Sequence, residues 1–113
     1  MDVTIFHNPR CSKSRAGVAA APDAEVVEYL REPLDRPALL DLLARLEDPP
    51  SALVRRDPLF RELGLTPADV ETADQVADVL AEHPQLMERP VIVKGDRAII
   101  GRPTERIAPF LAS

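Results

Sequence analysis

Hydrophobic and polar residues follow strand-like patterns in the first third of the chain. Residues 3–6 (Val-Thr-Ile-Phe) are all β-branched or aromatic, which favours a strand. Residues 25–30 (Glu-Val-Val-Glu-Tyr-Leu) form a second β-prone run. Between them, the Asn8-Pro9 break is followed by Ser, Arg, Ala and Val residues that favour a helix. Strand, helix and strand predict a βαβ unit with a right-handed crossover, so we expect the sheet to begin parallel.

The middle of the chain, residues 33–88, has helical spacing instead. Four leucines between 39 and 46 recur at positions i, i+3, i+4 and i+7, and apolar residues between 73 and 80 repeat this spacing. Thr72 with Gln75 has the form of a capping box, and Thr66-Pro67 is typical of another helix start. This block predicts a helical insertion.

The last quarter of the chain returns to strand patterns. Residues 91–93 (Val-Ile-Val) and 98–101 (Ala-Ile-Ile-Gly) flank a turn-like Lys-Gly-Asp-Arg segment and predict an antiparallel hairpin. A final helix is expected from Pro103 to Leu111, kept short or kinked by Pro109. The resulting order is βαβ, helices, ββα. With 113 residues and no linker-like segment, we expect one α/β domain, residues 1–113, with a mixed four-stranded sheet.

Charge and hydropathy exclude several function classes. A net charge of −5 argues against a nucleic-acid partner, which normally meets a basic face. The first residues lack the pattern of a signal peptide, and no apolar run approaches the roughly 20 residues needed to span a bilayer. We therefore expect a cytoplasmic protein without a membrane partner.

Cys11 is the only cysteine, which excludes an intramolecular disulfide, and with only His7 and His83 as other soft ligands no metal site is expected. It lies where a strand is predicted to give way to a helix. Free backbone N–H groups and the positive helix end favour a thiolate there, as do the nearby cations Arg10, Lys13 and Arg15. A lone cysteine is more often a small buried hydrophobic residue, but this polar loop favours a catalytic nucleophile.

His7 has two interpretations. At the end of the first strand it could lie near the thiol and lower the thiol's pKa as an imidazolium. It could equally cap backbone groups, and the sequence leaves both open.

The chain contains three further motifs: His-Asn-Pro-Arg-Cys-Ser-Lys-Ser-Arg at 7–15, His-Pro-x4-Arg-Pro at 83–90 and Gly-Arg-Pro-Thr-Glu at 101–105. Together they resemble the glutathione/glutaredoxin-coupled arsenate reductase family, and the likeness covers nearly the whole chain. The resemblance implies a thioredoxin-like fold with a cis-proline, Pro90, opposite Cys11. It also implies an oxyanion site formed by Arg55, Arg89 and Arg102, with Arg56 as an alternative to Arg55 because the central stretch is one residue shorter than in the family.

The same resemblance implies a reaction. Cys11 attacks arsenate, glutathione acts as co-substrate, and a glutaredoxin regenerates the enzyme, with no bound cofactor. Mycothiol or bacillithiol could replace glutathione. Reductases that relay a disulfide among their own cysteines are excluded because there is only one cysteine.

Two alternatives remain from the sequence. A related thiol oxidoreductase could act on another glutathione-linked substrate, since a fold and a motif do not fix a substrate. The Spx-type regulators, which dock on RNA polymerase, share the fold, but they usually sense redox state through Cys-x-x-Cys, and here position 14 is Ser.

Overall fold

The structure is a computed structural model, and it describes residues 2–113. A four-stranded sheet has the order β2-β1-β3-β4. Its strands are β1 (Val3–His7), β2 (Glu25–Glu28), β3 (Val91–Lys94) and β4 (Arg97–Ile100). The β1–β2 pair is parallel, whereas β1–β3 and β3–β4 are antiparallel. The predicted mixed sheet, with its parallel start and its C-terminal hairpin, is confirmed.

Five α-helices lie in the described residues: α1 (Ser12–Ala20), α2 (Arg36–Arg45), α3 (Pro58–Glu62), α4 (Ala73–Glu82) and α5 (Ile107–Ala112). Short 3-10 turns cover Pro50–Leu53, Pro67–Val70, Pro84–Leu86 and Thr104–Arg106. The chain divides into two compact units. The sheet unit comprises the residues up to Glu32 and Arg89–Ser113, and the helical unit is Pro33–Glu88. The insertion expected at 33–88 is thus confirmed.

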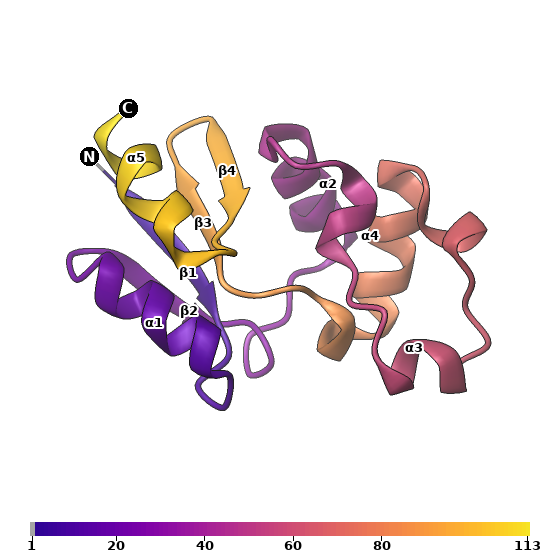
Figure 1. The fold of residues 1–113 in the computed structure, drawn as a ribbon. Coiled ribbons are helices and arrows are strands. Elements are labelled where there is room, and N and C mark those ends of the chain that lie inside the picture. Colours follow the sequence, from indigo (N-terminus) through magenta and orange to yellow (C-terminus); the bar gives the residue numbers. More distant parts are fainter. Residues whose placement is uncertain (1) are drawn as a thin grey trace. The chain divides into compact units, whose positions relative to one another are not determined.

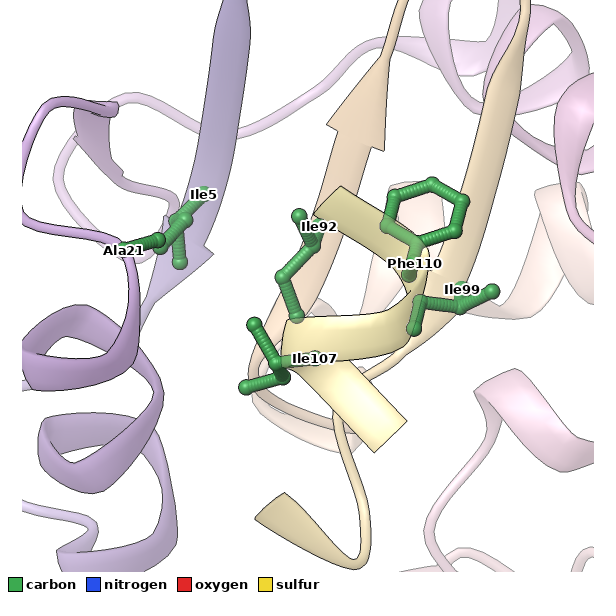
Figure 2. Packing of buried hydrophobic residues seen from close by; sticks show 6 residues of the cluster. All are labelled: Ile5, Ala21, Ile92, Ile99, Ile107 and Phe110. Atoms are coloured by element: carbon green, nitrogen blue, oxygen red, sulfur yellow. The ribbon is translucent and has the colours of Figure 1, made fainter. Parts of the chain in front are cut away.

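The core of the sheet unit is built on the strand register. Ile5 pairs with Ile92, and Ile92 pairs with Ile99, so the three side chains form a row across one face of the sheet. Ile107 and Phe110 of α5 join this cluster (Figure 2). Helices α1 and α5 lie on the same face of the sheet, in contact with one another (Figure 1). Val18 of α1 packs against this cluster, so burial of these apolar side chains holds α1, and with it the loop before α1, against the sheet.

Two boundaries differ from the sequence prediction. Strand β2 ends at Glu28 rather than at 30, because the Glu28 carbonyl accepts hydrogen bonds from the N–H groups of Arg31 and Glu32 and the chain turns there. The final helix is divided into a 3-10 turn and the short α5, which tolerates Pro109 because the first N–H groups of a helix need no intrahelical partner.

The helical unit packs α2 against α4, and their buried residues are the ones that helical spacing predicts. Thr72 and Gln75 form the predicted capping box of α4. Thr66 starts only a 3-10 turn, with Asp69 as its capping partner. On the surface, Arg36 of α2 pairs with carboxylates of α4.

Within residues 2–113, none of the helices has both the length and the apolar character required to cross a membrane.

Candidate active site

Cys11 lies at the junction of β1 and α1, as the sequence predicts. Its N–H donates to the Asn8 carbonyl at 3.0 Å, and its own carbonyl accepts the first helical hydrogen bond, from Arg15 N–H at 3.0 Å. Cys11 is therefore the N-cap of α1, with extended backbone dihedrals. The Asn8 side chain tightens the loop, because its Oδ1 accepts from Arg10 N–H at 3.0 Å.

Ser14 anchors the inner side of this loop. It is fully buried, and its Oγ accepts from Asn8 N–H at 2.9 Å and lies 2.7 Å from Nδ1 of His7. The two bonds tie the end of β1 to the first turn of α1. Among the described residues His7 has this side-chain hydrogen bond and none to Cys11, so the imidazole supports the loop. A direct role for His7 in catalysis stays a prediction.

Arg102, which is distant from Cys11 in the sequence, also contacts the sulfur. It follows β4 and Gly101, and its Nη2 donates to Cys11 Sγ at 3.2 Å. Its Nε donates to the Arg89 carbonyl at 2.7 Å, which fixes the direction of the guanidinium. Two of the three arginines named by the resemblance are thus brought together with the cysteine.

The setting of Cys11 favours the thiolate. Burial by itself raises the pKa of the Cys11 thiol. The backbone N–H of Ser14, the Arg89 side chain, the backbone N–H of Lys13 and the charge of Arg102 together outweigh burial, so the pKa lies below its ordinary value. The sulfur does not complete a conventional side-chain cap, yet the N–H groups of the first turn still act on it.

The cations that lower this pKa are not the ones expected from neighbouring sequence positions. The side chains of Arg10, Lys13 and Arg15 are exposed, and Arg15 donates to the Pro9 carbonyl at 2.9 Å. Arg89 and Arg102, distant in sequence, act on the thiol instead.

Pro90 precedes β3, and the Arg89–Pro90 bond is cis, as the resemblance implies; Arg102–Pro103 is also cis, which the sequence did not indicate. Two glycines leave room for the Pro90 ring. A Cβ at Gly17 would lie 2.6 Å from Pro90 Cγ, and a Cβ at Gly101 would lie 3.0 Å from the same atom. Sequence reasoning missed Gly17, whose only signal is a glycine within a helical pattern.

Arg55 belongs to the helical unit. It follows an isolated bridge between Val54 and Met87, and its N–H donates to the Leu86 carbonyl at 2.7 Å. Its guanidinium lies 3.5 Å from Asp57 Oδ2 and 3.9 Å from Glu88 Oε1. Arg56 is exposed. Two carboxylates therefore hold Arg55, and its role as an oxyanion ligand remains a prediction.

A thiolate at a helix N-terminus, with a guanidinium on its sulfur, can attack an electrophile that carries negatively charged oxygens, because the same donors bind those oxygens. Together with the mixed sheet and the cis-proline before β3, this arrangement defines a thioredoxin-like protein with a free cysteine at the N-terminus of α1.

Comparisons with known proteins specify the family. The sequence model of the ArsC family matches residues 6–110. The chain is 39% identical over 116 residues to an arsenate reductase of Neisseria meningitidis, covering 97% of this chain and 98% of the relative. An arsenate reductase of Haemophilus influenzae is 33% identical, with 98% and 100% covered. The solved structure of an arsenate reductase from Vibrio cholerae matches with a TM-score of 0.84 at 34% identity, covering 96% of this chain and 97% of that one. The chain belongs to the ArsC family.

Proposed function

We propose that this protein reduces arsenate to arsenite with Cys11 as nucleophile and with glutathione and a glutaredoxin as external reductants. The observation that carries the proposal is the contact between Arg102 Nη2 and Cys11 Sγ, because a guanidinium beside a thiol with a lowered pKa is suited to bind the oxygens of an anion that the thiolate attacks. Arsenate reductases of similar sequence along the full chain support arsenate as substrate.

In the first step the Cys11 thiolate attacks the As(V) centre. A sulfur–arsenic bond forms and one arsenate oxygen leaves as water after taking up protons. The guanidinium of Arg102, already directed at the sulfur by the Arg89 carbonyl, would bind the remaining oxygens, and Arg89 would share their charge. Arg55 is the proposed third ligand.

In the second step an external thiol completes the reduction, because the chain has no other cysteine. The thiolate of glutathione attacks the sulfur of Cys11, an S–S bond forms, and the electron pair of the S–As bond stays on arsenic, which leaves as As(III). A glutaredoxin then takes the glutathione from Cys11 by thiol–disulfide exchange and restores the thiolate. The reaction requires no bound cofactor or metal. Its need for reduced thiols fits the cytoplasm.

The test is a coupled assay with arsenate, glutathione, glutaredoxin, glutathione reductase and NADPH, in which arsenite is measured directly. Wild-type protein should produce arsenite, and Cys11→Ser should lower turnover by about 10³-fold or more because a serine hydroxyl is not ionised at neutral pH. Its melting temperature should change by only a few degrees, since Cys11 lies in a partly exposed loop.

Arsenite production near the wild-type rate in Cys11→Ser would refute the proposed nucleophile. Wild-type protein that exchanges glutathione on Cys11 but forms no arsenite would favour the alternative, a thiol oxidoreductase with another glutathione-linked substrate.

A further inference from the structure

We infer that a groove beside Cys11, lined by Arg10, Arg31 and Glu28, binds the polar ends of the reducing thiol and selects a small thiol that carries two carboxylates and an ammonium group. This inference rests on the proposed function for its role in turnover. The groove has a volume of ≈ 570 Å³, within the range of about 300–1,000 Å³ that small-molecule sites occupy.

The groove opens at the carboxyl ends of the two parallel strands. His7 of β1 pairs with Glu28 of β2, so the loops that follow these strands lie side by side at one edge of the sheet. The first loop contributes Asn8 to Arg10, and the second contributes Leu30 and Arg31. In sheets with parallel strands this edge is where ligands commonly bind.

Arg89 connects the groove with the reactive sulfur. Its side chain lines the groove, and the same side chain is among the groups that lower the pKa of Cys11. Arg10, the last residue of the loop after β1, directly precedes Cys11 in the chain. A thiol held in this groove would therefore have its sulfur within reach of Cys11, while its polar ends extend toward β2.

The charges in the groove point to the chemistry of its ligand. Arg10 and Arg31 are exposed, and within residues 2–113 neither guanidinium takes part in a hydrogen bond or an ion pair. Glu28 adds one carboxylate, and Leu30, which is 42% exposed, adds an apolar surface. Two guanidiniums complement two carboxylates, Glu28 complements an ammonium, and Leu30 suits an aliphatic stem. Glutathione has this set of groups, whereas an uncharged sugar thiol has none of them.

The experiment measures disulfide exchange on Cys11 without arsenate, so that it does not depend on the proposed function. The Cys11 thiolate attacks one sulfur of a disulfide, a mixed disulfide forms, and the other half leaves as a thiolate. Second-order rates are measured by intact mass with two probes, oxidised glutathione and the uncharged 2-hydroxyethyl disulfide. Their ratio separates recognition of the charged groups from the reactivity of Cys11.

We expect Arg10→Gln and Arg31→Gln each to lower the ratio by about three- to ten-fold, with the rate for the uncharged probe unchanged, because exposed charge-assisted contacts are partly screened by solvent. Glu28→Gln should lower the ratio for oxidised glutathione but not for 3,3′-dithiodipropionate, which has carboxylates and no ammonium. The matched control is Arg97→Gln, at the far end of β4, which removes the same charge and should leave the ratio unchanged.

The inference is overturned if Arg97→Gln lowers the ratio as much as the groove variants, since net charge alone would then explain the effect, or if no groove variant changes the ratio. It stands, and the proposed function fails, if the groove variants behave as expected while wild-type protein forms no arsenite from arsenate.

Discussion

The two units of the chain use their polar side chains differently. In the helical unit these side chains pair with one another: Thr72 and Gln75 cap α4, and Arg36 pairs with Asp74 and Asp78. In the sheet unit His7 and Ser14 also pair with one another, but the Arg102 side chain, together with backbone N–H groups of the first turn of α1, acts on one sulfur atom. Polar groups that satisfy each other stabilise a fold, whereas polar groups directed at a nucleophile prepare it for a reaction.

Arg55 and Arg102 show the same contrast at the level of one residue type. Arg55 faces two carboxylates, so part of its charge is already neutralised. Arg102 has the Arg89 carbonyl on Nε and the Cys11 sulfur on Nη2. Of the two arginines, Arg102 is therefore the one whose guanidinium contacts Cys11.

The largest effect that would sharpen this comparison is expected at Arg102. Arg102→Lys keeps the charge but loses the planar guanidinium, which donates to the Arg89 carbonyl and to the sulfur at the same time. We therefore expect kcat/KM for arsenate to fall ten-fold or more, equivalent to about 1.4 kcal/mol or more. Arg97→Lys is the control and should change kcat/KM little. Equal effects of both substitutions in steady-state assays would contradict the proposal that Arg102 binds the oxygens of arsenate.

The next effect concerns stability rather than chemistry. Gly17→Ala should improve the helix propensity of α1 by about 1 kcal/mol, but the new Cβ would lie 2.6 Å from the Pro90 ring, and overpacking of this kind costs about 1–3 kcal/mol. We expect a net loss in the free energy of unfolding, measured with urea. Ala16→Gly, at an exposed position of the same helix, should cost about 1 kcal/mol by propensity alone. A more stable Gly17→Ala variant would show that the ring can move aside.

Arg102 and Gly17 also show which features of the molecule the sequence can predict and which it cannot. The strands, the helical insertion and the place of Cys11 follow from local patterns of hydrophobicity, turns and caps, and they are confirmed except for the end of β2. Arg102 comes from a motif, but its bond to the Arg89 carbonyl depends on two loops meeting in space. Gly17 has no local signal for its contact with Pro90. The bond between His7 and Ser14 is equally non-local, since a strand end and a helix turn must first be packed together.

A smaller effect is expected from the helical unit. Thr72→Ala removes the side chain that accepts from Gln75 N–H at 3.2 Å, and loss of such a cap costs about 1 kcal/mol. Urea unfolding should show this loss, while kcat/KM per folded molecule stays at the wild-type value. Thr72→Ser, which keeps the accepting oxygen, should recover most of the stability. A large loss of activity in Thr72→Ala, under conditions where the variant is folded, would contradict the conclusion that this cap contributes to stability and not to catalysis.

The smallest effect is expected in the pH dependence of Cys11. Because the folded thiol has a lowered pKa, the thiolate should be present from a lower pH than in a free cysteine, whose pKa is about 8.5. The alkylation rate by iodoacetamide, a neutral reagent, should therefore rise and level off at a lower pH than for a free thiol. By linkage, the thiolate adds stability above the unfolded pKa, and this contribution is lost as the pH falls through the folded pKa.

Arg102→Gln should move the alkylation midpoint upward, with Arg97→Gln as the control. The change should be modest, since the backbone N–H groups of Ser14 and Lys13 and the Arg89 side chain also lower the pKa of Cys11. A midpoint that stays in place in Arg102→Gln, but rises in Arg89→Gln, would leave Arg89 as the side chain that activates the thiol and confine Arg102 to binding the substrate.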